Sequence, residues 1–244
     1  MRQTTKTALA LAVGAAVLLA AWPLQAQNAG RLKQQFAEAQ QQNKEALRSY
    51  TWTSRTEIRL KGESKNVKLE QVRYDLDGNL QKTEIGGTGE QQQQESASGR
   101  RRRGGRLKER IVKKKTAELT EEMQTLGALV ASYGQLSAEE MQAFAASATV
   151  GEGEGELAGT VRIDGGAIKQ PGDEMTVWID PQTFMMRRLQ ILTFYEDNEV
   201  RLITEFRSVV DGPTYQARTT LQYPERELEL IVENYDYEAV KRQR

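Results

Sequence analysis

The side chains of this sequence that could take part in chemistry are carboxylates, guanidinium groups and hydroxyls, because its 244 residues include no cysteine and no histidine. Their absence excludes a thiol nucleophile, a Ser-His-Asp triad, a disulfide framework and a His/Cys zinc site, which all need a thiolate or an imidazole. The sequence also contains no phosphate-binding loop and no nucleophile elbow. We therefore predict no catalytic residue, no metal site and no cofactor.

Four carboxylates near expected hairpin ends are the remaining candidates for acid–base catalysis: Asp164, Asp173, Glu174 and Asp180. A glycoside hydrolase needs two carboxyl groups about 5 to 9.5 Å apart, whereas acidic residues at hairpin ends usually form turns. Three glutamates alternate with glycine over 151–156 and lack the spaced Asp and Asn ligands of a calcium loop. We interpret the first group as turn residues, the second as a solvated connector, and the protein as a non-enzyme.

The strongest local charge is basic, although 34 Lys and Arg balance 34 Asp and Glu over the whole chain. Ten basic residues and one glutamate lie over 100–115. Such a cluster could attract an anionic lipid headgroup or an acidic envelope protein, or it could be a solvated loop and helix start. Nucleic acid is excluded as a partner because no aromatic residues are interleaved with the charges. The residues predicted for an anionic partner are Arg100, Arg101, Arg102, Arg103 and Arg106.

The first 26 residues have the order of a secretory signal peptide. Arg2 and Lys6 precede an uncharged run over 7–22, and Pro23 to Ala26 follow it. We predict cleavage after Ala26, export to the periplasm, and a mature protein that does not span the membrane. An uncleaved anchor is the alternative, but the apolar run is shorter than the ~20 residues that cross a bilayer. The remaining residues, 27–244, are expected to form a single domain.

Three helices are predicted from apolar stripes and capping residues. Residues 28–50 and 107–133 each carry apolar side chains on one helical face. Ser137 and Glu140 have the spacing of a capping box, which predicts a shorter helix after Ser137. Residues 86–106 consist mainly of Gly, Gln, Ser and Arg and predict a flexible loop.

Strands are predicted wherever the apolar period changes to two. In the strand that starts at Glu199, Val200, Leu202 and Phe206 form one row and polar residues form most of the other. We count eight or nine antiparallel strands. They are expected near 50–60, 67–76, 157–163, 174–180, 184–195, 199–208, 214–223 and 227–237, with room for a further N-terminal strand. The predicted fold class is therefore α+β: a strongly curved antiparallel sheet, an incomplete barrel, with an N-terminal helix and a central helical lid.

Large apolar side chains of the strands and helices could line a pocket between the sheet and the lid, where they would shield hydrocarbon from water. The same side chains could instead fill an ordinary core. The candidates for the pocket are Trp52, Ile58, Met123, Phe144, Trp178, Phe194, Phe206, Tyr215 and Tyr223.

The order of these elements resembles the periplasmic outer-membrane lipoprotein carrier class, with the LolA/LolB-like fold. The segments that carry the resemblance are Tyr50-Thr51-Trp52 at the start of a long strand, Trp178-Ile179-Asp180-Pro181 at a hairpin, and Glu233-Asn234-Tyr235 near the end. The resemblance implies an incomplete barrel whose helices cover an apolar cavity, and it implies a lipid or a lipidated protein as cargo. The loop over 86–106 departs from that class.

Two hypotheses follow. The first is an exported, non-enzymatic carrier or chaperone that binds acyl chains or a lipidated protein between the sheet and the helices. The second is a module of the cell envelope that docks an anionic partner through its basic loop.

Overall fold

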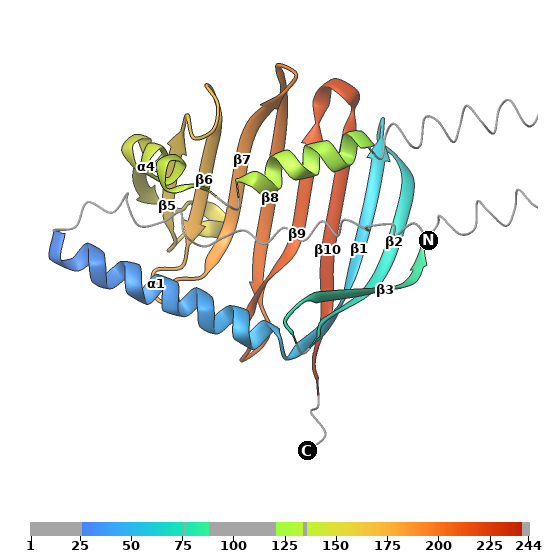
Figure 1. Cartoon of the computed structure of the whole chain (residues 1–244), viewed down its shortest axis with the longest axis horizontal. Coiled ribbons are helices and arrows are strands. Elements are labelled where there is room, and N and C mark those ends of the chain that lie inside the picture. Colours follow the sequence, from blue (N-terminus) through green and yellow to red (C-terminus); the bar gives the residue numbers. More distant parts are fainter. Residues whose placement is uncertain (1–25, 76, 88–120, 134–135, 241–244) are drawn as a thin grey trace, which may run out of the picture.

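The computed structural model describes residues 26–75, 77–87, 121–133 and 136–240, with the backbone alone for 26–33 (Figure 1). Apart from Ala26, the predicted signal peptide lies outside these residues, as do the basic cluster and nearly all of the predicted loop. Among the described helices, none combines the length and the apolar character that a membrane crossing requires.

Within the described residues, the strands form one antiparallel sheet in the order β3-β2-β1-β10-β9-β8-β7-β6-β5-β4. The last strand of the chain pairs with the first, and the sheet stays open between its edge strands β3 and β4. The strands are β1 (Tyr50–Leu60), β2 (Glu63–Tyr74), β3 (Leu80–Gly87), β4 (Thr149–Glu152), β5 (Val161–Gly166), β6 (Glu174–Ile179), β7 (Met186–Tyr195), β8 (Asn198–Ser208), β9 (Thr214–Tyr223) and β10 (Leu228–Ala239).

The fold class is confirmed, but the described sheet has ten strands instead of eight or nine. The strand that sequence patterns missed is β4, whose last two residues, Gly151 and Glu152, belong to the segment interpreted as a connector. All of its residues are exposed, so no apolar row marks it, and it is held by backbone pairing with β5. The strand expected at 157 begins instead at Val161, because Gly155–Leu157 forms a 3-10 turn.

The helices are α1 (Ala26–Leu47), α4 (Ala138–Ser147) and a helix over 121–132, drawn in light green in Figure 1 and called helix 121–132 below. The capping box is confirmed: the Glu140 backbone N–H donates to Ser137 Oγ at 3.2 Å, and the Ser137 N–H donates to Glu140 Oε2 at 2.7 Å. The long helix predicted over 107–133 is confirmed for its described part. Gly86 and Gly87, predicted as loop, end β3.

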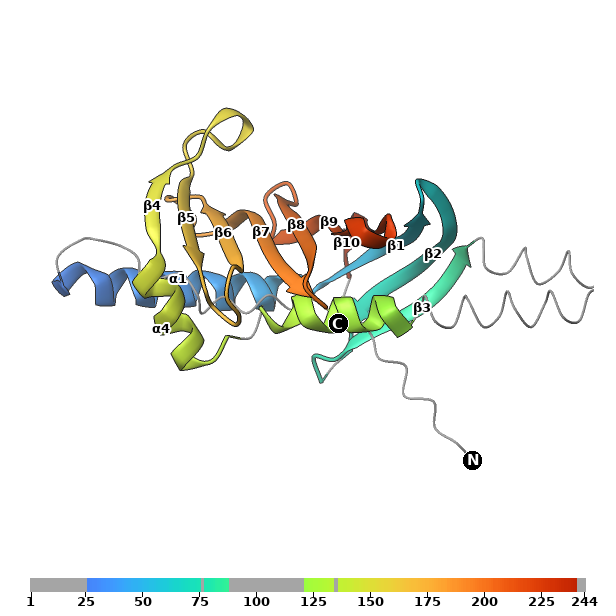
Figure 2. The ribbon, with the colours of Figure 1, turned by 90° about the horizontal axis from the view of Figure 1, so that it is seen from above.

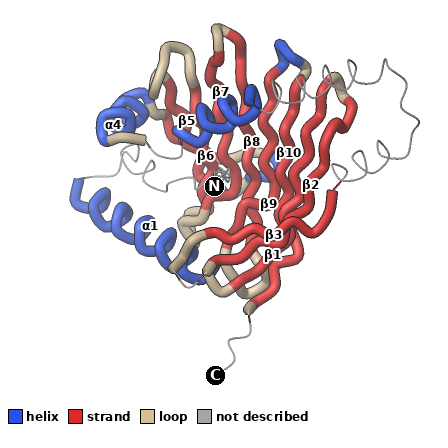
Figure 3. The backbone as a smooth tube through the Cα atoms, turned by 45° about the vertical axis from the view of Figure 1, so that its right-hand side comes forward, coloured by secondary structure: helices blue, strands red, loops and turns tan. Residues whose placement is uncertain are grey.

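The sheet curves, and the helices lie on one side of it (Figures 2 and 3). We call the side that they cover the inner face and the opposite side the outer face. Asn43 of α1 donates to the Thr214 carbonyl oxygen at 2.8 Å, which places α1 at the end of the strands where β9 begins. Helix 121–132 lies toward the other end, because Glu122 pairs with Arg226 in the β9–β10 turn. The two long helices therefore cross different ends of one face.

The core fills the space between the inner face and the helices. Phe36 of α1, Leu126 of helix 121–132 and Phe144 of α4 are all buried in one cluster with the sheet. In β8 the predicted alternation holds, since Val200 and Leu202 belong to this cluster and Arg201 between them is exposed. Burial of these side chains, at about 25 cal/mol per Å² of apolar surface, is what holds the helices on the sheet.

Candidate binding site on the inner face of the sheet

An apolar band crosses five strands of the inner face and forms the sheet side of the candidate site. Directly paired residues of β1, β10, β9, β8 and β7 make one row of it, and the next row lies nearer the β9–β10 turn. Paired residues share a face because side chains alternate along a strand. We call this band the apolar belt; it consists of Ile58, Leu230, Leu221, Leu202 and Ile191 in the first row and Leu60, Leu228 and Tyr223 in the second.

Helix 121–132 lies in the same buried cluster as this belt. Met123, Leu126 and Val130 recur at helical spacing on one face of the helix, and their exposed fractions are 5%, 0% and 1%. These helix side chains therefore belong to the core that covers the belt.

A buried polar cluster anchors the C-terminal end of this helix, and we call it the Tyr133 anchor. The Tyr133 hydroxyl donates to Asp173 Oδ2 at 2.8 Å and lies 2.7 Å from Thr193 Oγ1 on β7. Gln170 donates to the same Thr193 oxygen at 2.6 Å, so the Thr193 hydroxyl is left to donate to Tyr133. Tyr133, Asp173 and Thr193 are each 1% exposed or less.

The Asp173 carboxylate of the anchor is held by its own loop. Its oxygens accept the backbone N–H groups of Ile168 at 2.7 Å, Lys169 at 2.8 Å and Gln170 at 3.2 Å. Burial, together with the neighbouring carboxylate, raises the pKa of the Tyr133 phenol well above its ordinary value. The buried hydrogen bonds of Tyr133 hold this end of the helix.

The N-terminal end of the described helix is held by a weaker contact. Arg226 Nε lies 3.0 Å from Glu122 Oε1, and 61% of the Arg226 side chain is exposed. Exposed ion pairs stabilise by about 0–1 kcal/mol because solvent screens them. Among the polar contacts of the described helix, those of Tyr133 are thus strong and that of Glu122 is weak.

An aromatic cluster lies at the opposite end of the inner face. The rings of Trp52 and Tyr237 stack with centroids 5.2 Å apart. The Tyr215 ring centroid lies 4.0 Å from that of Tyr237, and the Tyr74 centroid lies 5.7 Å from that of Trp52. Burial raises the pKa of Tyr237 above its ordinary value. The cluster joins β1, β2, β9 and β10 at the end where those strands meet α1.

The structure places most predicted pocket residues on the inner face and divides them between two clusters. Met123, Phe144 and Tyr223 are buried in the core, and Ile58 and Phe206 pack against it. Trp52 and Tyr215 belong instead to the aromatic cluster described above. Contact of any of these residues with a ligand stays a prediction.

Trp178 and Phe194 are placed differently from the prediction, on the outer face. Trp178 alternates with the buried Val177 and lies under the Arg162 guanidinium, 5.9 Å from the ring centroid. Phe194 follows the inward Thr193 and is paired with Glu199. The residues predicted for an anionic partner, Arg100 to Arg103 and Arg106, lie outside the described residues.

Three of the four candidate catalytic carboxylates have structural partners. Asp164 accepts from Arg162 at 2.7 Å and from Thr176 at 2.9 Å. Asp180 accepts two backbone N–H groups of the β6–β7 turn at 2.9 and 3.1 Å, which confirms the interpretation of this residue as a turn former. Asp173 belongs to the Tyr133 anchor, and Glu174 is exposed at the start of β6.

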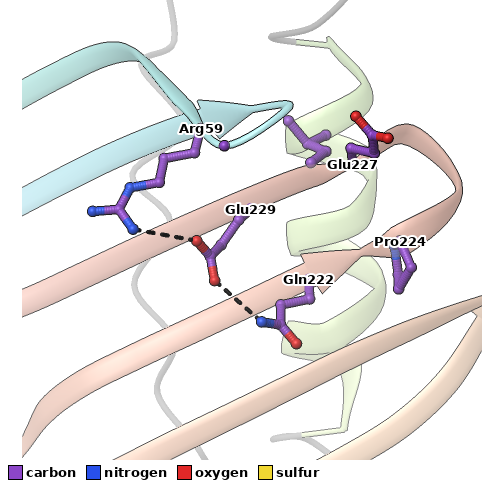
Figure 4. A pocket seen from close by; sticks show the side chains of 7 residues that line it. Arg59, Gln222, Pro224, Glu227 and Glu229 are labelled. Atoms are coloured by element: carbon purple, nitrogen blue, oxygen red, sulfur yellow. Dashed lines mark hydrogen bonds and ion pairs between the residues drawn. The ribbon is translucent and has the colours of Figure 1, made fainter.

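The outer face carries paired charges and a hollow of about 400 Å³ beside the β9–β10 turn (Figure 4). Glu57, although 3% exposed, lies between Arg59 at 2.8 Å and Arg55 at 2.7 Å. The hydrogen bond from Arg59 is the main reason that the pKa of Glu57 falls to about 2. Arg59 also pairs with Glu229 across the hollow, at 3.6 Å. This hollow lies on the outer face, so it is not the cavity between the sheet and the helices that the sequence predicts.

Comparison with known proteins gives only distant structural similarity. No protein-family model and no curated protein matches the chain. Its structure is similar to a DUF1329 family protein from Desulfovibrio piger, with a TM-score of 0.42, 9% identity, and coverage of 87% of this chain and 94% of that one. It is also similar to a domain from Vibrio parahaemolyticus named for outer membrane lipoprotein sorting, with a TM-score of 0.40, 10% identity, and coverage of 86% and 92%. It is similar as well to a LolA superfamily protein from Nitrosomonas europaea, with a TM-score of 0.36, 8% identity, and coverage of 85% of this chain and 94% of that one.

Proposed function

We propose that this protein is an exported, non-enzymatic carrier that binds acyl chains, of a lipid or of a lipidated protein, against the apolar belt. The observation that carries the proposal is the cover of that belt. Helix 121–132 packs in one buried cluster with the belt, and its polar contacts are buried at Tyr133 and exposed at Glu122.

The exchange of helix for cargo is feasible on energetic grounds. A carrier must hide its apolar surface from water when empty and hide its cargo when loaded. If an acyl chain replaces Met123, Leu126 and Val130 against the belt, the belt stays out of water in both states. The apolar face of the helix must then pack against the cargo.

The Tyr133 anchor would keep the displaced helix attached to the sheet, and the Glu122–Arg226 pair would be the contact that breaks. Periplasmic location follows from the predicted signal peptide and belongs to the same proposal. Docking of an anionic lipid or envelope protein through Arg100 to Arg106 stays the alternative prediction.

The test is to tether the weak end of the helix. Because the chain contains no cysteine, Glu122→Cys and Arg226→Cys can be joined specifically by a short bis-maleimide. The probe is diphenylhexatriene, an uncharged hydrocarbon that fluoresces when shielded from water. The control carries Arg226→Cys alone, blocked with a mono-maleimide.

We expect saturable binding of the probe by the control and at least tenfold weaker binding by the tethered protein. Equal binding by the two proteins would refute the proposed movement of the helix. Absence of saturable binding to either protein would refute the carrier.

A further inference from the structure

A polar band lies beside the apolar belt on the inner face. One inner row further along the strands, Thr56 pairs with Val232, Val232 with Thr219, and Thr219 with Thr204. In the row after that, Ser54 pairs with Asn234. We call these five polar residues, Ser54, Thr56, Thr204, Thr219 and Asn234, the hydroxyl belt. Because alternate residues of a strand are about 7 Å apart, it lies within one ligand length of the apolar belt.

The buried hydroxyls of this belt are unusual for a packed core. Ser54, Thr204 and Thr219 are 4%, 1% and 6% exposed. A buried hydroxyl costs free energy unless it is hydrogen-bonded, and valine has nearly the same shape as threonine without that cost. Thr204 Oγ1 and Thr219 Oγ1 lie 3.2 Å apart, so one hydroxyl donates to the other. A second O–H of the pair then remains as a donor for another acceptor.

The charges next to the hydroxyl belt are already paired. Lys68 and Glu70 of β2 lie opposite Thr56 and Ser54 on the same face. Lys68 Nζ contacts Glu70 at 2.5 Å and Glu84 at 3.6 Å, and Lys82 Nζ lies 3.8 Å from Glu70. Two ammonium groups thus face two carboxylates. An ionised headgroup gains no net counter-charge here, whereas an uncharged oxygen acceptor can use the hydroxyl donors.

We infer that the preferred ligand is an amphiphile with an uncharged, oxygen-bearing head, such as a glycerol ester, and not a bare hydrocarbon or an ionised lipid. Its chain lies along the apolar belt, and its ester or hydroxyl oxygens accept one hydrogen bond from the free O–H of the Thr204–Thr219 pair and one from Thr56. This inference rests on the proposed function, since it assigns the head of the ligand to the same face that receives the chain.

The test compares three twelve-carbon ligands by displacement of diphenylhexatriene: monolauroylglycerol, n-dodecane and laurate. The variant carries Thr204→Val and Thr219→Val together, because removing both partners of a buried hydrogen bond costs little, whereas removing one leaves the other unsatisfied. The matched control is Thr220→Val, which makes the same change in β9 on the outer face, opposite Ile231. Far-UV circular dichroism verifies that the variants are folded.

We expect the unmodified protein and the Thr220→Val control to bind monolauroylglycerol about tenfold more tightly than n-dodecane, as two neutral hydrogen bonds of about 0.7 kcal/mol each would give. The double variant loses the hydrogen bond of the pair and keeps the one from Thr56, so its preference should fall to about threefold, with its affinity for n-dodecane changed less than twofold. An unchanged preference in the double variant, or tighter binding of laurate than of monolauroylglycerol, overturns the inference while leaving the carrier intact. Absence of saturable probe binding overturns both.

Discussion

Replacement of Tyr133 by phenylalanine separates the contribution of the Tyr133 hydrogen bonds to stability from that of core packing. The ring and its packing remain, and only the hydroxyl is lost. Asp173 loses one donor but keeps three backbone N–H groups. Thr193 keeps its hydrogen bond from Gln170 but loses Tyr133 as the acceptor of its own O–H. Hydrogen bonds to charged groups contribute about 1.5–3 kcal/mol, so Tyr133→Phe should lower the free energy of unfolding by about 2 kcal/mol. For a domain of this size that corresponds to a fall in Tm of about 4–8 °C.

Urea denaturation followed by tryptophan fluorescence measures this change as a shift of the midpoint at constant slope. Hydrogen exchange over 121–133 gives a local measurement, because weaker anchorage by about 2 kcal/mol speeds exchange through local opening roughly 30-fold. The control is Tyr235→Phe at a ring that is 38% exposed, where we expect less than about 0.5 kcal/mol. A loss below 0.5 kcal/mol in Tyr133→Phe, with unchanged exchange, would refute the assignment of the anchor.

Two further predictions concern the outer face and α4. Because the pKa of Glu57 is lowered from 4.5 to about 2, its contribution to stability is complete above pH 4.5 and is lost as the pH falls toward 2. Glu57→Gln should therefore flatten the dependence of the urea midpoint on pH. Parallel curves of midpoint against pH for the variant and the unmodified protein would contradict this. Gly165→Ala should destabilise by about 1–3 kcal/mol, because the added Cβ would lie 2.5 Å from the Phe144 ring. The control is Gly151→Ala, whose added Cβ would meet open space. Equal urea midpoints for the two variants would contradict this packing argument.

The elements with a strong periodic pattern could be predicted from the sequence. Alternation marks β8 and β9 because one of their faces is buried and the other is in water, and the Ser137 capping box marks the start of α4 because both partners lie within one helical turn. The edge strand β4 has no buried face and so leaves no pattern. Its pairing with β5 depends on backbone hydrogen bonds, which any residue except proline can make.

The candidate site was only partly predictable. The stripe of helix 121–132 showed which side chains face the core, and a buried tyrosine at its end needs a hydrogen-bond partner. Its partners Asp173 and Thr193, however, lie 40 and 60 residues further along the chain. Trp178 has the size of a core residue, but it stands in the row of Glu174 and Thr176, opposite to that of Met175 and Val177. The row itself was the signal that could have placed it.

What the sequence alone determined is the α+β class, the alternation of the strands and the positions of α1, α4 and helix 121–132, because periodicity and capping act between residues close together in the chain. Only the tertiary structure decided that β1 pairs with β10, that helix 121–132 covers the apolar belt, and that Thr56, Thr219 and Thr204 come together beside it. These contacts join segments far apart in sequence. They depend on the register and curvature of the whole sheet, which no single segment specifies.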